Sequence, residues 1–336
     1  MALPTRPLGR DGPQITTVGF GAWAVGGGEW AFGWGPQDDE TSIAAMLHAL
    51  ELGINWIDTA AVYGLGHSER VVGRLLEELP TNDRPLIFTK GGQVWDDENP
   101  FVNPKPTLQP DSVRQECENS LRRLGVETID LYQYHWPSDD TPFEESWSTM
   151  MRLIEEGKVR WGGVSNYDVS QLDRCESVRH VDSLQPPFSL VKRSAAADVI
   201  PWCAEHGTGV ICYSPMQAGL LTDRFSTERM GTLAKHDWRQ RSPEFHPPAI
   251  DRNLALRDAL RPTAQRHGVS VASVAVAWTL AWPGTSGAIV GARTPEQVDG
   301  WIDAAALELT DHDLEEIAHC IRATGAGEGP EQPPTT

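Results

Sequence analysis

Short apolar runs of strand length alternate with longer amphipathic segments along most of the 336 residues. The apolar runs predict eight strands, at residues 16–21, 54–58, 86–90, 129–135, 159–165, 181–185, 209–213 and 287–290. Segments with helical periodicity predict helices at 41–52, 68–78, 111–124, 143–156, 169–175, 194–206, 251–267, 270–281, 295–306 and 311–323. Gly53 and Gly125 follow two of these helices, at the position where a left-handed glycine commonly ends a helix.

This alternation predicts the fold class. Strands separated by helices pair in parallel, and eight such units close into a (β/α)8, or TIM, barrel. We expect one barrel domain over residues 1–324, with an N-terminal hairpin around the Asp11-Gly12 turn and closing helices at the C-terminal end. Residues 325–336 are rich in Gly, Pro and Glu and predict a disordered tail.

Two connections are longer than a link between a strand and a helix requires. Residues 91–110 follow the third predicted strand, and residues 221–250 follow the seventh. Loops this long in a compact domain are usually functional or disordered. Both leave the carboxyl ends of barrel strands, so we expect them to cover a substrate and a cofactor.

Composition narrows the range of partners. The 28 Lys and Arg stand against 47 Asp and Glu, which gives a net charge of −19. An acidic surface repels phosphate backbones and anionic lipid heads, which argues against nucleic acid and membrane partners. No apolar run approaches the roughly 20 residues that a membrane span needs. The five cysteines are scattered, odd in number and without metal-ligand spacing, a pattern typical of reduced thiols. We therefore expect a cytoplasmic protein with a small-molecule partner and no metal; a homo-oligomer is compatible with this composition.

Four polar residues lie at or just beyond the ends of predicted strands. Asp58 and Tyr63 share the segment after the second strand, Lys90 ends the third strand, and His135 ends the fourth. The carboxyl ends of all barrel strands open on one face, and that face carries the chemistry. Each residue alone has an ordinary structural explanation, such as a turn cap or a solvated lysine. Their joint placement on one face predicts a proton-transfer site.

The four side chains complement one another chemically. A free tyrosine has a pKa of about 10, and a neighbouring cation such as Lys90 lowers it. Asp58 would hold the lysine charge, and His135 would orient a substrate carbonyl by a hydrogen bond. Tyr63 would then act as general acid toward the carbonyl oxygen. Such a site suits carbonyl reduction, with hydride supplied by a nicotinamide because no side chain can donate hydride.

Aromatic side chains gather near the same strand ends. Of 13 tryptophans, five fall in or beside strand-end loops, namely Trp23, Trp30, Trp34, Trp95 and Trp136. They are candidates for the walls of an apolar substrate pocket. Which substrate this pocket accepts depends on the loops, including residues 222–250, whose conformation the sequence does not fix.

At these residues the chain strongly resembles the aldo-keto reductases. The second-strand segment 58–64 with Ser68 and Glu69 resembles a signature of that family, as does the segment 162–167 at the fifth strand. Segments 184–189, 213–221 and 289–297 resemble the motifs of strands six, seven and eight. The resemblance covers about residues 5 to 320 in the same order. It implies a TIM barrel that reduces aldehydes or ketones.

The resemblance implies a role for each matching residue. Tyr63 is the proton donor, and Asp58, Lys90 and His135 complete a catalytic tetrad. Ser165, Asn166 and Gln185 would hold the nicotinamide carboxamide, and Phe188 would lie where the family usually places a tyrosine against the nicotinamide ring. The implied cofactor-binding residues are Trp23, Ser165, Asn166, Gln185, Phe188, Tyr213, Ser214, Pro215, Met216, Gly219, Leu220, Gly291, Arg293, Thr294 and Gln297. Trp23, Trp30, Trp95 and Trp136 would wall the substrate pocket.

Arg293 favours NADPH over NADH, since a guanidinium fork suits a ribose 2′-phosphate. One departure bears on this end of the cofactor. Many relatives follow the glutamine of the eighth-strand motif with Glu-Asn three and four residues later, whereas this chain has Gly300 and Trp301.

Three other functions remain open alternatives. Residues 19–24 fit a relaxed G-x-G-x-x-A dinucleotide fingerprint, but Gly26-Gly27-Gly28 follows instead of a helix start, which argues against a Rossmann dehydrogenase. Lys90 at a strand end would also suit a Schiff-base aldolase. Some relatives bind nicotinamide and act as regulatory subunits without turnover; the intact tetrad argues for turnover here.

Overall fold

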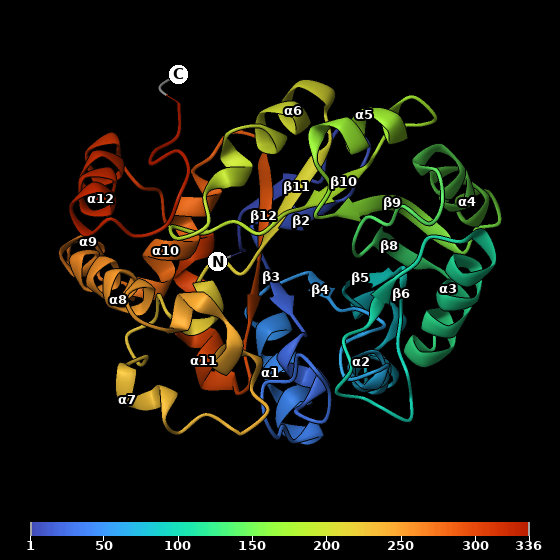
Figure 1. Ribbon diagram of the computed structural model, residues 1–336, viewed down its shortest axis with the longest axis horizontal. Helices are drawn as coiled ribbons and strands as arrows, with labels where there is room; N and C mark the ends of the chain where they lie inside the picture. Colours follow the sequence, from blue (N-terminus) through green and yellow to red (C-terminus); the bar gives the residue numbers. More distant parts are fainter. Residues whose placement is uncertain (1, 335–336) are drawn as a thin grey trace.

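A closed barrel of eight parallel strands lies at the centre of the computed structural model, which describes residues 2–334 (Figure 1). The strands are, in order around the barrel, β3 (Val18–Gly21), β4 (Trp56–Asp58), β5 (Leu86–Gly91), β8 (Ile129–Tyr134), β9 (Val159–Ser165), β10 (Ser183–Gln185), β11 (Gly209–Tyr213) and β12 (Thr285–Gly291). The predicted (β/α)8 fold and its N-terminal hairpin are confirmed.

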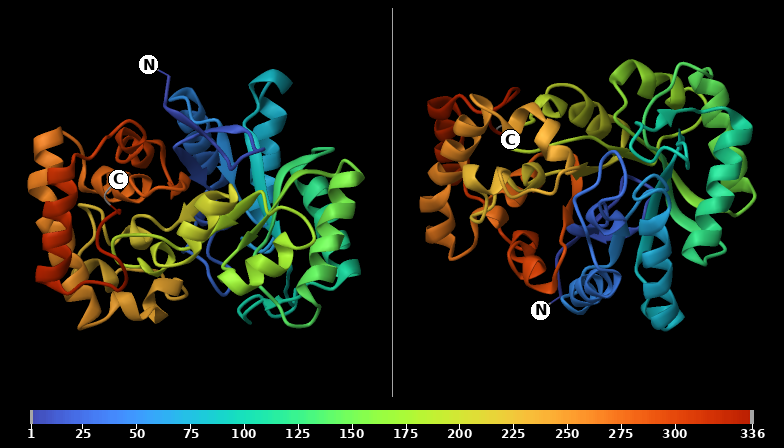
Figure 2. Two further views of the ribbon diagram at one scale, coloured as in Figure 1. Left: turned by 90° about the horizontal axis from the view of Figure 1, so that it is seen from above. Right: turned by 60° about the horizontal axis from the view of Figure 1, so that its bottom comes forward.

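Helices surround the barrel as an outer layer. They are α1 (Asp39–Glu51), α2 (His67–Glu78), α3 (Pro110–Leu124), α4 (Phe143–Glu155), α5 (Val169–Glu176), α6 (Val199–His206), α8 (Ala249–Ala259), α9 (Arg261–His267), α10 (Val271–Leu280), α11 (Pro295–Asp299) and α12 (Asp311–Thr324). Both views of Figure 2 place the orange and red helices, from α8 onward, together on one side of the barrel. One large apolar cluster joins the outer faces of the strands to these helices.

Three predicted helices are broken in the structure. The segment 251–267 divides into α8 and α9 because Pro262 lacks the amide N–H that would continue the ladder. The segment 194–206 contains a 3₁₀ turn at Ser194–Ala196 before α6, whose first amide is capped by the Asp198 carboxylate. In the segment 295–306 the α-helix ends at Asp299, and a 3₁₀ turn at Ile302–Ala305 follows Gly300 and Trp301.

The N-terminal hairpin closes the bottom of the barrel. Strands β1 (Thr5–Pro7) and β2 (Gln14–Thr16) pair antiparallel. Leu8 and Ile15 from this hairpin pack against a layer of inward-pointing side chains formed by Trp56, Phe88, Leu131, Ile211 and Ile289. Because side chains alternate along a strand, the residues two positions later point into the barrel one layer higher. That upper layer contains the site described below.

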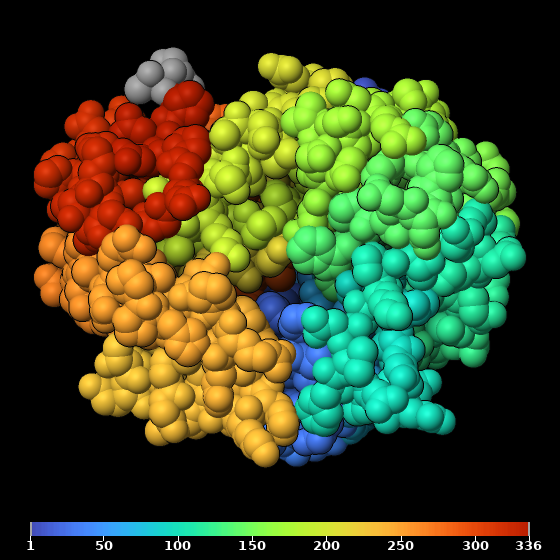
Figure 3. All heavy atoms as spheres, in the orientation of Figure 1, coloured from blue at the N-terminus to red at the C-terminus, as the bar shows by residue number. Residues whose placement is uncertain are grey.

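The two long connections meet over the open end of the barrel. Residues 91–110 contain a short hairpin of β6 (Gln93–Val94) and β7 (Lys105–Pro106), and residues 221–250 contain α7 (Thr227–Met230) with two 3₁₀ turns. The ring of Phe101 lies 4.7 Å from that of His236. Figure 3 shows a hollow between these two segments, with blue N-terminal residues at its base. The geometry supports the expectation that these connections cover a pocket.

Residues 325–334 of the tail, for which we predicted disorder, make defined contacts with the rest of the chain. Ala326 is buried, and Glu328 forms a backbone bridge with Lys192. The Arg193 guanidinium donates to the carbonyls of Ala326 (3.0 Å) and Gly329 (3.3 Å). Gly327 and Gly329 both have positive φ, and a Cβ at either would collide with the backbone of residues 191–194. The glycines that suggested disorder therefore permit close backbone contact; residues 335–336 lie outside the described part.

None of the helices described between residues 2 and 334 is long and apolar enough to span a bilayer.

Candidate active site

The upper layer of the barrel brings together three of the four predicted tetrad residues through strand geometry alone. Asp58 lies two residues after Trp56 in β4, and Lys90 lies two residues after Phe88 in β5. Lys90 Nζ donates to Asp58 Oδ1 at 2.5 Å and to the Thr59 carbonyl at 2.9 Å. His135 follows β8 directly, and its amide donates to the Gly91 carbonyl at 2.9 Å.

Tyr63 joins the other three from the turn after β4. Its hydroxyl lies 3.4 Å from Lys90 Nζ, and its ring meets the His135 ring edge-on with centroids 5.7 Å apart. Gly64 fixes this turn, because its φ is positive and a Cβ there would lie 2.2 Å from the Gly26 carbonyl oxygen. The structure thus places Asp58, Tyr63, Lys90 and His135 in one constellation.

Burial dominates the electrostatics of the Asp58–Lys90 pair. Desolvation raises the pKa of the Asp58 carboxyl and lowers the pKa of the Lys90 ammonium. The short contact between the two charges opposes both shifts, since each charge stabilises the other. Gln185 adds a second partner, because its Nε2 donates to Asp58 Oδ2 at 2.9 Å. Asp58 is therefore held between a cation and an amide with 2% of its surface exposed.

The structure corrects the expectation that Lys90 lowers the Tyr63 pKa. Desolvation raises the pKa of the Tyr63 phenol well above its ordinary value, and the Asp58 carboxylate raises it further. The Asp58 carboxylate lies closer to Lys90 Nζ than the phenol does and offsets part of the field of the ammonium at the phenol. Tyr63 is therefore a neutral phenol that keeps its proton at physiological pH.

His135 is also neutral. Desolvation lowers the pKa of its imidazole well below the ordinary value, and the Lys90 charge adds to this effect. Its Nδ1 is buried and finds no partner among the described residues. A neutral imidazole beside a neutral phenol can offer hydrogen bonds to an oxygen atom without adding charge before the reaction.

Three residues predicted to hold a carboxamide form a network beside the tetrad. Asn166 Nδ2 donates to the His135 carbonyl and to Ser165 Oγ, both at 3.0 Å. The Tyr213 hydroxyl donates to Asn166 Oδ1 at 2.9 Å. Ser165 Oγ donates to the Gln185 carbonyl at 2.8 Å. Asn166 adopts φ +64°, a strained conformation for a residue other than glycine, and the hydrogen bonds of its amide hold it there.

Gln133 is a member of this layer that the sequence reasoning missed. It is fully buried two residues after Leu131 in β8, and its Oε1 accepts from Gln185 Nε2 at 3.2 Å. Alternation along β8 was the signal that could have identified it, because the same spacing separates Phe88 from Lys90.

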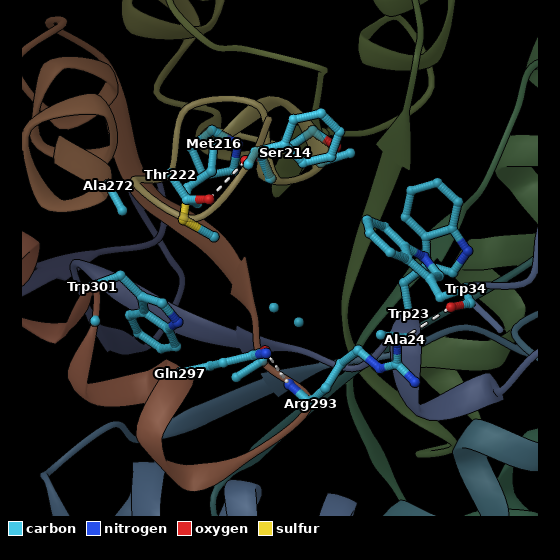
Figure 4. Close-up of a pocket in the computed structure, with 18 of the residues that line it drawn as sticks. Trp23, Ala24, Trp34, Ser214, Met216, Thr222, Ala272, Arg293, Gln297 and Trp301 are labelled. Atoms are coloured by element: carbon cyan, nitrogen blue, oxygen red, sulfur yellow. Dashed lines mark hydrogen bonds between the residues drawn. The ribbon is translucent and has the colours of Figure 1, made fainter. Parts of the chain in front are cut away.

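A pocket of about 450 Å³ reaches the tetrad, and Figure 4 shows some of the residues that line it. Asp58 and Tyr63 line this pocket, as do Ser270, Gly300 and Trp301. The predicted cofactor residues that line it are Trp23, Tyr213, Ser214, Pro215, Met216, Gly219, Gly291, Arg293 and Gln297. They come from β11, β12, the segments that follow β3, β11 and β12, and α11.

Six predicted cofactor residues do not line this pocket: Ser165, Asn166 and Gln185, which form the network beside the tetrad, and Phe188, Leu220 and Thr294. Phe188 has no exposed surface and packs between Trp278 and Trp282, with centroids 5.4 and 5.5 Å away. Leu220 is buried in the apolar cluster of the 221–250 connection, with Phe225, Phe245 and Ile250. Thr294 sits at the N-cap of α11. Tyr213, not Phe188, presents an aromatic ring to the pocket, because Phe188 lies past the end of β10 and turns outward.

Arg293 is already engaged by the chain. Its guanidinium donates to Gln37 Oε1 (2.7 Å), to the Trp34 carbonyl (3.3 Å) and to the Pro36 carbonyl. Arg239, another pocket residue, pairs with Asp237 at 2.6 Å and lies over the Trp34 ring. Arg224 and Arg229 also line the pocket, are exposed, and form no ion pair with any residue from 2 to 334.

The predicted aromatic walls are only partly brought together. Trp30 and Trp95 join Trp23 and Tyr63 in one apolar cluster. Trp136, in contrast, is 42% exposed and belongs to no such cluster. Trp238, which the sequence reasoning did not single out, stacks on Trp23 with centroids 5.1 Å apart. Trp238 lies in the 221–250 connection. The prediction that this connection covers the pocket could have identified it.

Comparison with known proteins gives a consistent result over the whole chain. Residues 17–322 match the model of the Aldo/keto reductase family. Aldo-keto reductase YhdN of Bacillus subtilis (strain 168) is 34% identical over 96% of both chains. An NADH-specific methylglyoxal reductase of Escherichia coli (strain K12) is 33% identical over 94% of this chain and 98% of its own. The solved glycerol dehydrogenase AKR11B4 from Gluconobacter oxydans is 37% identical over 100% of both chains, with a TM-score of 0.86.

Proposed function

We propose that this chain, which belongs to the aldo/keto reductase family, reduces aldehydes or ketones with NADPH and uses Tyr63 as the proton donor. NAD(P)H-dependent carbonyl chemistry is general to that family, and its members here are oxidoreductases. The finer proposal rests on one observation, the neutral Tyr63 hydroxyl at the pocket wall between Lys90 and His135. The methylglyoxal reductase and the glycerol dehydrogenase among the relatives support a small carbonyl or alcohol substrate.

The pocket fits a nicotinamide dinucleotide. Its volume falls within the range of about 300–1,000 Å³ that is usual for small-molecule sites. Four arginines line it, which supplies the basic surroundings that phosphate groups need in an otherwise acidic protein. We expect Ser165, Asn166 and Gln185 to hold the carboxamide and Tyr213 to lie against the nicotinamide ring. When bound, the reduced nicotinamide supplies hydride to the carbonyl carbon.

The tetrad would handle the proton. His135 and Tyr63 orient the carbonyl oxygen by hydrogen bonds, and Tyr63 passes its proton to that oxygen as negative charge develops. The phenolate left behind gains the nearby Lys90 ammonium as a stabilising charge, which Asp58 keeps in position. Lys90 Nζ has three protein partners, Asp58, Thr59 and Tyr63, so no observation favours a Schiff-base aldolase.

A comparison of carbonyl compounds in the presence of NADPH or NADH tests this function. Loss of the absorbance of the reduced nicotinamide with reactive aldehydes supports it, and a faster loss with NADPH than with NADH supports the cofactor preference. Absence of any turnover with either cofactor, although both bind, would favour the regulatory alternative.

The rate of carbonyl reduction should vary little with pH across the neutral range. The pKa of Tyr63 is raised and the pKa of His135 is lowered. The phenol therefore stays protonated as pH rises from about 6 to 9, and the imidazole stays neutral as pH falls through its ordinary value of about 6.5. Single-turnover measurements at saturating cofactor check this. A tenfold loss of rate on going from pH 7 to pH 9 would mean that the phenol ionises there.

Arg229→Ala should weaken NADPH binding by roughly tenfold more than NADH binding, the loss expected of one charge-assisted hydrogen bond. Arg229 lines the pocket and forms no ion pair with any residue from 2 to 334; burial is the main cause that lowers the pKa of Arg293, and the charge of Arg229 adds a smaller contribution. Arg293→Ala should weaken both cofactors, because Arg293 ties residues 34–37 to the pocket wall. Calorimetric titration measures each affinity.

Arg252→Ala is the matched control for the Arg229 prediction. Arg252 is an exposed arginine outside the pocket lining, so its loss should leave both affinities unchanged. Equal losses for NADPH and NADH in Arg229→Ala would remove this residue from the recognition of the 2′-phosphate.

A further inference from the structure

One wall of the pocket is built on an unfavourable backbone conformation. Residues 214–219 form a turn after β11, and Ser214 and Met216 from this turn line the pocket (Figure 4). Ser214, Gln217 and Ala218 have φ of +57°, +46° and +50°, in the left-handed region that residues other than glycine rarely adopt. Such a conformation persists where the surrounding structure holds it. The shape of this wall therefore depends on the contacts behind it.

A buried serine holds this turn from behind. Ser189 has no exposed surface, and its hydroxyl donates to Gln217 Oε1 at 2.9 Å. The same hydroxyl oxygen accepts the backbone amides of Val191 (3.1 Å) and Lys192 (3.0 Å). A hydroxyl has two lone pairs and one proton, so the amides use both lone pairs and the proton is left for Gln217. The hydrogen bond to the left-handed turn therefore depends on the fold of residues 189–192.

The C-terminal tail contacts this same segment. The Arg193 amide donates to the Glu328 carbonyl at 3.0 Å, and the Glu328 amide donates to the Val191 carbonyl at 3.3 Å. Gly327 lies so close to the segment that a Cβ there would be 2.0 Å from the Val191 carbonyl oxygen. The Arg193 guanidinium, which is 3% exposed, adds the hydrogen bonds to the tail carbonyls described above. The tail therefore fixes the segment that supports the pocket wall.

A second connection between this segment and the pocket is weaker. Lys192 Nζ pairs with Glu244 Oε1 at 2.9 Å, in the 221–250 connection that covers the pocket. The Lys192 side chain is 48% exposed, and exposed ion pairs contribute little to stability. The buried hydrogen bond from Ser189 to Gln217 is therefore the main route from the tail to the pocket.

We infer that the C-terminal tail is a positioning element for cofactor binding, which acts through Ser189 and Gln217 on the pocket wall at residues 214–219. Residues 326–331 do not line the pocket, so the tail acts on the wall and not on the cofactor. This inference rests on the proposed function, because it concerns the cofactor that the function requires. Thermodynamic linkage also requires the reverse effect: a bound cofactor stabilises the docked tail by the same factor.

Gly327→Ala tests the inference in the full-length protein, because the added methyl group collides with the Val191 carbonyl and displaces the tail. The dissociation constant of NADPH, measured by calorimetric titration, should rise by roughly tenfold, which corresponds to one lost hydrogen bond. Gln217→Met, which removes the acceptor of the Ser189 proton, should have a similar effect. The double variant should bind NADPH no more weakly than Gln217→Met alone, because both changes break the same connection. An unchanged affinity in Gly327→Ala, or additive losses in the double variant, would overturn the inference.

Gly125→Ala is the matched control. Gly125 has φ +66°, close to the +63° of Gly327, so an alanine meets the same backbone strain at both positions. A Cβ at Gly125, however, would meet no atom of the described residues within 4 Å apart from its chain neighbours. The control should lose thermal stability but keep its affinity for NADPH. A loss of affinity equal to that of Gly327→Ala would overturn the inference, because the effect would then follow from backbone strain alone.

Hydrogen exchange in the wild-type protein answers the same question if the variants do not fold. Saturating NADPH should slow exchange of the Arg193 and Glu328 amides by roughly tenfold, the factor that linkage requires. The Val126 amide, which donates to the Leu121 carbonyl at the end of α3, should exchange at the same rate with and without NADPH. No slowing at Arg193 and Glu328 although NADPH binds would overturn the inference. Failure of the proposed function looks different: neither NADPH nor NADH would then bind to the wild-type protein.

Discussion

Tyr63→Phe should lower kcat for carbonyl reduction by about 10²- to 10⁴-fold, the usual contribution of a positioned general acid. The dissociation constant of NADPH should stay within a few-fold of its original value, because the ring that faces the pocket is retained. The variant loses only the proton that we propose is passed to the carbonyl oxygen. Single-turnover rates together with cofactor titration separate these two effects.

Tyr167→Phe provides the control for this prediction. Tyr167 is a buried tyrosine whose hydroxyl also lacks a partner in the described chain, but it packs against Phe143 away from the pocket. Its replacement should leave kcat unchanged. Turnover by Tyr63→Phe at the original rate would refute the assignment of Tyr63 as the acid.

Lys90→Met should destabilise the fold by about 3–5 kcal/mol, the usual effect of leaving one partner of a buried ion pair uncompensated. Lys90 and Asp58 are 1% and 2% exposed, so water cannot replace the missing ammonium. Burial already raises the pKa of the Asp58 carboxyl. The variant should therefore regain stability as pH falls, because the protonated carboxyl carries no charge. Urea unfolding at several pH values measures both effects.

The double variant Asp58→Asn with Lys90→Met separates stability from chemistry. Removal of both charges should restore much of the lost free energy of unfolding, since replacing a whole buried pair is often nearly neutral. It should not restore turnover, because the phenolate of Tyr63 would still lack a cation beside it. Recovery of activity in the double variant would show that Lys90 acts only as a structural partner of Asp58.

The tetrad was accessible from the sequence because it depends on local rules. Strand length, alternation and the order of units place Asp58, Lys90 and His135 at the carboxyl ends of parallel strands, whatever the details of packing. Tyr63 follows from its place just after the second strand, and the resemblance to the family then added the carboxamide residues. The sequence could not place the side chain of Phe188, because a position beside a strand end does not say which way the chain turns. The structure turns Phe188 into the helix layer and Tyr213 toward the pocket.

Contacts between distant segments decided the rest. The sequence suggested that Arg293 is available to bind a 2′-phosphate. In the structure its guanidinium donates to residues 34–37, and Gln37 is 256 positions away in the chain. The tail after residue 325 looked disordered, but Arg193 binds its carbonyls. Trp238 reaches Trp23 only because the 221–250 connection folds back over the barrel.

The sequence by itself determined the barrel, its order of strands and the face on which Asp58, Lys90 and His135 meet, because periodicity and spacing act over a few residues. Only the tertiary structure decided that Tyr63 remains a neutral phenol, that Arg293 is occupied and that the Trp301 indole lines the pocket. The physical reason is that desolvation and hydrogen-bond partners depend on every segment packed around a group. Those segments are brought together by the fold and are not neighbours in the chain.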